Sequence, residues 1–298
     1  MSDTLETLRF LSVGHARRIA SQVGTPVYIY GEAPLEAAAK AVLAFPNAFG
    51  LTARFAMKAC PNGNILRFFS NLGIGLDCSS GFEVERALAA GILASRITLT
   101  CQEIPENLAS LLKRGMAFNA SSLAQIEAFA KAKPRGELGL RINPGLGSGS
   151  TNRTNGGGPA ASFGIWKDAV DEARALADQL LVKVVRLHTH IGSGSDPAVW
   201  QRGAGMSLDF MDGFPEVKAF DLGGGFKVGR MAGEKTTDLQ EVGLPVKEAF
   251  EAFARKTGRR LHLEIEPGTW LVANAGALLT TVQDIADTGA EGYRFLKV

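Results

Sequence analysis

The segment RFAMKAC, residues 54–60, begins the repeat that decides the fold. It has the small and apolar composition of a buried strand, with Lys58 as a charge near its end. In an extended strand, Lys58 would lie on the same face as Ala56 and Cys60. A lysine there is either a paired structural charge or a reactive amine. The rest of the chain has to decide between these two interpretations.

A regular alternation of strand and helix patterns follows Pro61. The strand candidates are residues 51–59, 73–79, 96–101, 116–122, 137–143, 182–191, 217–224 and 259–266. Helical patterns occupy the intervals between them. Eight such units predict a (β/α)8 barrel of the α/β class, because an open doubly wound sheet rarely needs eight.

Both ends of the chain depart from this repeat. A strand pattern in residues 21–32 precedes a helical one, and strands 277–285 and 293–298 follow each other with no helix between them. This change predicts a second, β-rich domain that both termini build. The expected division is residues 1–33 for an N-terminal strand of that domain, 34–272 for the barrel, and 273–298 for the start of the remainder.

The composition excludes several classes of protein. The chain has 298 residues, of which 46% are hydrophobic and 21% charged, and its formal net charge is +2. These values give no reason to expect a nucleic-acid or membrane partner. No apolar run is long enough for a bilayer, and the first residues do not resemble a signal peptide. Cys60, Cys78 and Cys101 form no close pair, which favours the reducing cytoplasm.

Polar residues gather where the predicted strands end, which is where barrel enzymes have their active sites. They are Lys58, Asp77, Asn119, Arg141, Asn143, His188, His190, Ser193, Asp221, Glu264 and Glu266, together with the glycines Gly223, Gly224 and Gly225. Packing of the core is a poor explanation for so many polar residues at one rim. The glycine-rich stretch 143–159 is predicted to be a long loop at this rim, either a solvated connection or a lid.

The chemistry of this set points to one cofactor. A lysine whose pKa is lowered by burial or by nearby cations can form a Schiff base. Consecutive glycines such as Gly223 to Gly225 expose N–H groups that bind phosphate, and Ser193 would add a hydroxyl donor. A lysine, a phosphate site and a carboxylate at the opposite rim together suggest pyridoxal phosphate.

Six motifs make the resemblance to a known family specific. They are FAMKAC, GLDCSSGFEVERAL, LRINPG, HTHIGSGSD, DLGGGF and EIEPGTW, in this order. As a set they resemble the fold-type III, pyridoxal-phosphate-dependent decarboxylases, which act on diaminopimelate, ornithine, arginine or carboxynorspermidine. The resemblance covers residues 25 to 298. The spelling HxHIGSGS is most similar to the branch that converts meso-diaminopimelate to L-lysine, so this lyase activity in lysine biosynthesis is the expected function.

The resemblance implies a role for each matched residue. Lys58 would bind the cofactor covalently, His190 would stack on its ring, and Glu266 would pair with the ring nitrogen. These three are the expected catalytic residues, and no metal is expected. The implied phosphate ligands are Ser193, Gly223, Gly224, Gly225, Gly268 and Thr269. Supporting positions are matched by Asp77, Glu83 and Arg141. His188 would face the same side as His190 and support the site from behind.

Two departures from the family pattern matter. Thr269 stands where the family usually has an arginine, and a hydroxyl can donate a hydrogen bond but carries no charge. The family's C-terminal domain supplies a cysteine–acid motif and a tyrosine, and it completes the partner's site in a homodimer. The chain reads as a family member that stops early in this domain. We therefore expect residues 1–298 alone to bind the cofactor weakly and not to decarboxylate.

Four alternatives stay open at this point. The substrate could be ornithine, arginine or carboxynorspermidine. His188 and His190 could be the histidine pair of a metal-dependent barrel hydrolase. The alanine-racemase branch shares barrel and cofactor but has an arginine at the ring nitrogen, where this chain has Glu266. Small barrels that only carry the cofactor lack the β-rich domain that this chain begins.

Overall fold

The predicted repeat closes into a barrel in a computed structural model, which describes residues 10–147, 156–192, 196–231 and 233–298. Eight parallel strands follow one another in the order β5-β4-β3-β2-β10-β9-β8-β6, and pairing of β6 with β5 closes the ring. They are β2 (Leu51–Ala56), β3 (Gly75–Cys78), β4 (Ile97–Thr100), β5 (Ala117–Ala120), β6 (Glu137–Asn143), β8 (Lys183–Thr189), β9 (Ala219–Asp221) and β10 (His262–Ile265). Each predicted range contains one of these strands, so the (β/α)8 barrel is confirmed.

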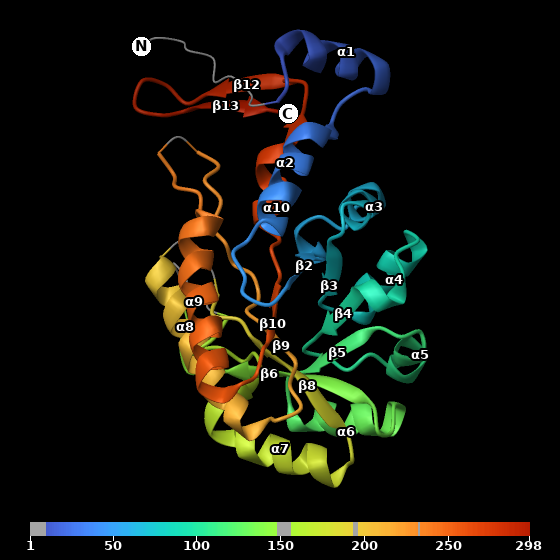
Figure 1. The fold of residues 1–298 in the computed structure, drawn as a ribbon. Coiled ribbons are helices and arrows are strands. Elements are labelled where there is room, and N and C mark those ends of the chain that lie inside the picture. The colour runs from blue at the N-terminus through green and yellow to red at the C-terminus, as the bar shows by residue number, and fades with distance from the viewer. Residues whose placement is uncertain (1–9, 148–155, 193–195, 232) are drawn as a thin grey trace.

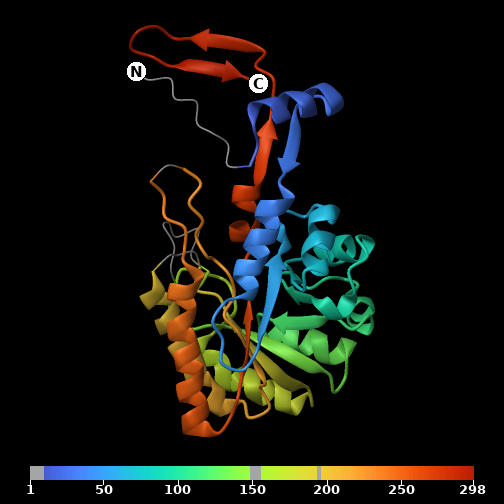
Figure 2. The same ribbon diagram turned by 45° about the horizontal axis from the view of Figure 1, so that its top comes forward.

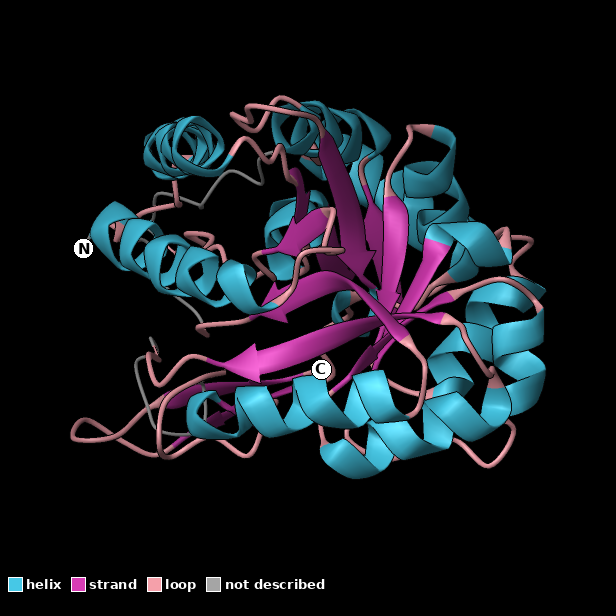
Figure 3. Ribbon diagram, turned by 60° about the horizontal axis from the view of Figure 1, so that its bottom comes forward, coloured by secondary structure: helices cyan, strands magenta, loops and turns pink. Residues whose placement is uncertain are grey.

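Helices surround this ring of strands (Figure 3). They are α3 (Gly63–Asn71), α4 (Gly81–Ala89), α5 (Leu108–Lys113), α6 (Leu123–Ala132), α7 (Val170–Gln179), α8 (Pro197–Asp209), α9 (Leu239–Thr257) and α10 (Thr269–Val272). Their apolar faces pack on the outside of the strands; α3, for example, buries Leu66 and Phe69. Among the helices of the described residues, none is both long and apolar enough to cross a membrane.

The first barrel strand is shorter than predicted. β2 ends at Ala56, and residues Met57–Ala59 form a 3-10 turn, η1. The N–H of Cys60 donates to the carbonyl of Met57 at 3.1 Å, which closes this turn. The prediction that Lys58 alternates with Ala56 and Cys60 on one strand face is therefore wrong. Lys58 instead leaves the strand end from a turn, and its side chain is exposed.

The two ends of the chain pair with each other, as predicted. β1 (Val27–Tyr30) runs antiparallel to β11 (Gly276–Leu279), so Val27 lies opposite Leu279. The single predicted strand 277–285 is wrong, because β11 ends at Leu279 and a separate strand, β12 (Asp284–Asp287), pairs with β13 (Arg294–Lys297). This hairpin and α1 (Val13–Val23) lie beyond the barrel end at which the strands finish (Figures 1 and 2).

Helix α2 (Glu32–Leu43) connects this terminal region to the barrel. It begins beside the expected boundary at residue 33 and buries Leu35, Ala39 and Val42. Among the shorter elements, β7 (Ile165–Trp166) pairs with the last two residues of β6, and η6 (Ala273–Ala275) precedes β11. Three further 3-10 turns are η2 (Ala94–Arg96), η4 (Lys167–Ala169) and η5 (Phe210–Gly213). The division of the chain into domains stays a prediction.

The interior of the barrel is polar at its centre, unlike the apolar outer face. Side chains alternate along each strand, so Arg186 and His188 of β8 face the interior while Leu187 faces the helices. On β10, Glu264 is interior in the same way. The parallel register places His188 beside Asp221 of β9. Buried charges of both signs therefore meet inside the barrel.

Candidate active site

Lys58 lines two hollows at the end of the barrel at which the strands finish, and these hollows share Lys58, His190 and Glu266. The larger one, of about 550 Å³, is also lined by Gly224, Gly225, Lys227, Arg230, Gly268 and Thr269. The smaller one, of about 310 Å³, is also lined by Asp77, Ser79, Thr100, Arg141, Phe163 and His188. The fold thus brings the predicted lysine, histidine and carboxylate together between a glycine-lined space and a charged one.

The positions of the remaining predicted residues differ. Gly223 contacts His190 directly, whereas Ser193 lies outside the described residues. Another hollow, of about 560 Å³, is lined by residues of α7, β8 and the segment after α8. None of the predicted site residues lines it. The candidate site is therefore the pair of hollows around Lys58.

The three consecutive glycines allow backbone approaches that no other residue would permit. A Cβ atom on Gly224 would lie 2.0 Å from the carbonyl oxygen of Glu266. Gly223 and Gly225 have φ angles of +73° and +97°, in the left-handed region that favours glycine. The N–H of Gly223 donates to Asp221 Oδ1 at 2.9 Å, and that of Gly224 to His190 Nδ1 at 3.1 Å. These two bonds occupy the N–H groups of Gly223 and Gly224, so of the three glycines predicted to bind phosphate only Gly225 has its N–H outside them.

His190 is held as a neutral ring. Its Nδ1 accepts the hydrogen bond from Gly224, so the neutral tautomer carries its proton on Nε2. Burial, reinforced by the positive charges of Arg141 and Lys58, lowers the pKa of His190 to about 3. At neutral pH the ring is therefore uncharged, and its planar face is available for stacking.

A glycine of the long loop after β6 packs against the same ring. A Cβ atom on Gly156 would lie 2.3 Å from His190 Cδ2, so this contact requires glycine. Buried Asn143 fixes this part of the loop, because its Nδ2 donates to the carbonyl of Gly158 at 3.0 Å and its Oδ1 accepts from the N–H of Gly158 at 2.8 Å. Asn143, predicted as a rim residue, thus shapes the loop.

Asp77 is a buried acid that holds a proton. Its side chain is buried at the end of β3, and its Oδ1 has no hydrogen-bond partner among the described residues. Burial, followed by the negative charge of Glu266, raises the pKa of Asp77 to about 8 even though Lys58 and Arg141 oppose the shift. The carboxyl is therefore largely protonated at neutral pH and can donate a hydrogen bond into the smaller hollow.

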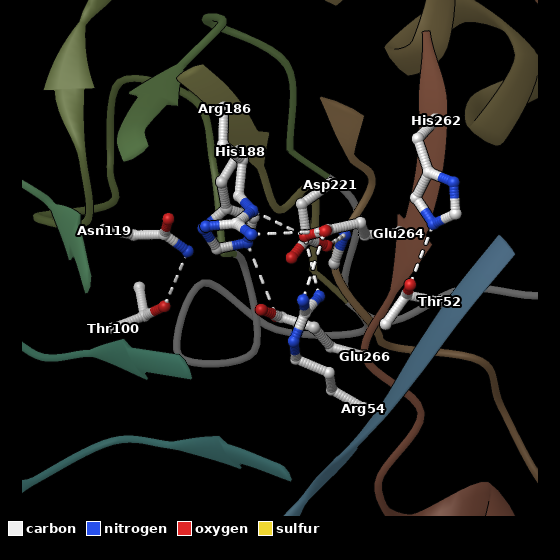
Figure 4. Close-up of polar contacts among 11 residues, drawn as sticks. Thr52, Arg54, Thr100, Asn119, Arg186, His188, Asp221, His262, Glu264 and Glu266 are labelled. Carbon is white, nitrogen blue, oxygen red and sulfur yellow. Dashed lines mark hydrogen bonds and ion pairs between the residues drawn. The ribbon is translucent and has the colours of Figure 1, made fainter. Parts of the chain in front are cut away.

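Glu266 has the opposite charge state. Burial is the largest single influence and acts to raise its pKa, but His188, with His190 and Lys58, lowers it by more in total, so the net shift is downward and Glu266 is an anion. His188 Nε2 lies 3.4 Å from Glu266 Oε2, and in the part of the chain that the structure describes Glu266 Oε1 has no hydrogen-bond partner (Figure 4). An anionic oxygen without a partner, buried beside a cavity, is suited to a cationic N–H group of a ligand.

His188 and His190 do not form the metal pair that one alternative requires. Within the described residues, one group has the proximity that a metal ion needs: ligand atoms of His188, Asp221 and Glu266 lie within 4.8 Å of one another. His190 is not part of this group, and its Nδ1 is occupied by Gly224. The geometry thus gives no support to a two-histidine hydrolase site.

Glu264, predicted at the rim, belongs to a structural cluster below it. Arg54 Nη1 lies 2.6 Å from Glu264 Oε2, and Arg186 Nε donates to the same oxygen at 2.6 Å. Arg54 Nη2 and Arg186 Nη2 donate to Oε1 at 3.1 and 3.2 Å (Figure 4). Similarly, Asn119 donates to Thr100 Oγ1 at 3.0 Å. These two predicted rim residues have partners inside the barrel.

Glu83 also has a local role. Its carboxylate accepts the N–H of Ser79 at 2.7 Å while its own N–H donates to the N-cap Ser80 Oγ at 3.2 Å, so Glu83 helps to cap the start of α4. The sequence did not single out Lys227 or Arg230, which line the larger hollow, because no local pattern marks them as cavity residues.

Comparison with known proteins defines the class to which this fold and this site belong. The family described as pyridoxal-dependent decarboxylase, pyridoxal binding domain, matches residues 35–273. The chain therefore belongs to the family of pyridoxal-dependent decarboxylases.

Within this family, the chain is similar to diaminopimelate decarboxylases. It is 31% identical to that of Escherichia coli K12 over 289 residues, which are 95% of this chain and 68% of the relative. It is 32% identical to that of Streptomyces coelicolor over 283 residues, 92% of this chain and 62% of the relative. A crystal structure of a diaminopimelate decarboxylase superposes with a TM-score of 0.88 at 30% identity, covering 96% of this chain and 68% of the other.

Proposed function

We propose that this decarboxylase uses pyridoxal phosphate to convert meso-diaminopimelate into L-lysine and CO2. The observation that carries the proposal is the convergence of Lys58, His190 and Glu266 between the two hollows. The similarity to diaminopimelate decarboxylases at 31 and 32% identity supports the choice of substrate.

The residues of the site fit this cofactor. Glu266 Oε1 is buried, anionic and without a partner, which suits the protonated nitrogen of a pyridine ring. The close approach of Gly224 to the backbone of Glu266 makes a cradle that any larger side chain would fill. Lys58 lies between these two features as a primary amine open to the cavity.

Each residue would then make a distinct contribution. Lys58 would hold the cofactor through its Nζ, and neutral His190 would provide a flat surface for the ring. Gly225, Gly268 and Thr269 would surround the phosphate, with Lys227 and Arg230 as the cations that line the same hollow. Glu266 would hold a proton at the ring nitrogen. When bound, pyridoxal phosphate supplies the electron sink for the electron pair that stays on carbon after CO2 leaves.

The charged hollow would receive the substrate. Arg141 and the protonated Asp77 line it next to Lys58, and both can donate hydrogen bonds. A second carboxylate of an amino acid is a good acceptor for such donors. We propose that these groups orient the substrate or the cofactor's polar edge within this hollow.

We further propose that the protein acts in the cytoplasm as a homodimer. The three cysteines are free and buried, which supports a reducing compartment. The resemblance of the motifs to dimeric decarboxylases supports the assembly. Light scattering of the complete gene product should give twice the mass of one chain, and a monomeric mass at working concentration would contradict this.

The test of the proposed activity uses the complete reading frame. CO2 release should require pyridoxal phosphate and be fastest with meso-diaminopimelate in a panel that includes ornithine, arginine and carboxynorspermidine. Faster release from one of the other three would correct the substrate. Activity that a chelator abolishes and pyridoxal phosphate does not affect would favour a metal-dependent hydrolase instead.

A second experiment locates the cofactor. Reduction with borohydride in the presence of pyridoxal phosphate should label Lys58, and Lys58→Ala should abolish the label and the CO2 release. Lys40→Ala, at an exposed pair with Glu36, is the matched control and should change neither. A single barrel site labelled at unchanged yield in Lys58→Ala would contradict the assignment.

A further inference from the structure

His188 is a buried histidine that the proposed chemistry has not yet used. Its side chain is 1% exposed, and it enters the barrel interior from β8, two residues before His190. Its Nε2 lies 3.4 Å from Glu266 Oε2. A ligand atom of Asp221 lies within 4.8 Å of this pair. One imidazole thus faces two carboxyl groups in a water-poor space.

The two carboxyl groups do not share the charge equally. Burial, followed by the charge of Glu266, raises the pKa of Asp221 well above its ordinary value, whereas the net pKa shift of Glu266 is downward. The pair therefore favours the proton on Asp221 rather than on Glu266, and Asp221 Oδ1 accepts the N–H of Gly223. Glu266 is the anion. His188 contacts its Oε2, so Oε1 stays without a hydrogen-bond partner among the described residues.

We propose that His188 is a positioning residue that holds Glu266 as an anion, with its free oxygen directed to the cofactor's ring nitrogen. This inference rests on the proposed function. The ring nitrogen and Glu266 compete for one proton. Stabilisation of the carboxylate by His188 keeps that proton on the ring, since a buried carboxylate without this neighbour would bind the proton itself.

Other charged groups do not replace His188 in this role. Arg54 and Arg186 are both engaged with Glu264. Arg141 and Lys58 also favour the anionic form of Glu266, but among the described residues neither forms an ion pair with its carboxylate. His188 does contact the carboxylate, at 3.4 Å, from β8 inside the barrel.

The test compares three variants of the complete gene product loaded with ¹⁵N-labelled pyridoxal phosphate. His188→Leu keeps bulk but removes the polar contact, His188→Gln keeps an uncharged N–H donor, and His262→Gln is the matched control. His262 lies at the opposite end of the barrel, where its Nε2 is 2.8 Å from Thr52 Oγ1. The readout is the ¹⁵N chemical shift of the ring nitrogen, which reports its protonation and which a purely structural role of His188 would not change.

We expect the unchanged protein and His262→Gln to give the shift of a protonated ring. His188→Leu should move it toward that of a neutral pyridine, with His188→Gln in between, and CO2 release should fall about 10- to 100-fold, as for outer partners of other catalytic groups. If His188→Leu does not retain the cofactor, His188→Gln decides alone. The inference would be overturned if His188→Gln, and His188→Leu where it binds the cofactor, still gave the ¹⁵N shift of a protonated ring. Lack of cofactor-dependent CO2 release by the unchanged protein would instead contradict the proposed function.

Discussion

The barrel interior has two levels of buried charges, a lower one around Glu264 and an upper one around Glu266, two residues further along the same strand. The charges of the two levels differ in the partners they have. At the lower level, both oxygens of Glu264 are bound by the guanidinium groups of Arg54 and Arg186. At the upper level, Glu266 Oε1 and both ring nitrogens of His188 have no hydrogen-bond partner within the described residues. The strands are the same and the residue types are similar, but of the two glutamates only Glu264 has both carboxylate oxygens hydrogen-bonded within the described residues.

The difference separates charges that stabilise the barrel from charges arranged for a ligand. A buried polar atom without a partner costs about 1–3 kcal/mol, so a stable fold tolerates it only for a reason. The unpartnered atoms of Glu266 and His188 belong to residues that line the smaller hollow together with Lys58. Removing a charge from the lower level should therefore affect folding, and removing one from the upper level should affect chemistry.

The largest effect is expected for Glu264→Gln. This change leaves two buried guanidinium groups facing an uncharged amide, so the free energy of unfolding should fall by about 3–5 kcal/mol. Urea titration measures it. The control is Glu36→Gln at the exposed pair with Lys40, where the loss should stay below about 0.5 kcal/mol. Equal losses in the two variants would show that the lower cluster does not stabilise the barrel.

Glu266→Gln should produce the reverse pattern. The cofactor should still bind, but decarboxylation should slow by about 10²-fold or more, because an amide holds the ring proton less strongly than a carboxylate. The free energy of unfolding should change less than in Glu264→Gln. Steady-state CO2 release at full cofactor occupancy measures the first quantity, and unchanged turnover would remove Glu266 from this role.

Thr269→Arg tests whether the upper level lacks positive charge at the phosphate. The guanidinium should tighten cofactor binding by about 2 kcal/mol, the value of a good charge-assisted hydrogen bond. Fluorescence titration with pyridoxal phosphate measures the change, and Thr280→Arg, outside both hollows, controls for net charge. No gain in affinity would mean that Lys227 or Arg230 already supplies the charge or that arginine does not fit.

The smallest effect is expected for Gly156→Ala. Its Cβ would approach His190 Cδ2 to 2.3 Å, so the ring has to move, and cofactor binding should weaken by about 1 kcal/mol. Gly205→Ala, on α8 with no atom within 4 Å of the added Cβ, should leave the affinity unchanged. Equal affinity of the two variants would show that the loop does not fix His190.

The sequence by itself determined the barrel and the end of the barrel at which the site lies. Strand and helix periods are local properties, and parallel strands necessarily finish at one rim. For this reason the eight strands and the gathering of Lys58, His190 and Glu266 were predictable. The pairing of β1 with β11 was predictable as well, because the loss of the repeat at both ends is visible in the sequence.

Only the tertiary structure decided which polar residues at that rim have partners within the protein. Glu264 and Glu266 have the same residue type, the same strand face and a spacing of two, so no local pattern distinguishes them. Their difference comes from contacts with side chains of other strands: Arg54 and Arg186 reach Glu264, whereas His188 contacts Glu266. The turn that carries Lys58 and the contact of Gly156 with His190 likewise depend on hydrogen bonds and packing between distant segments.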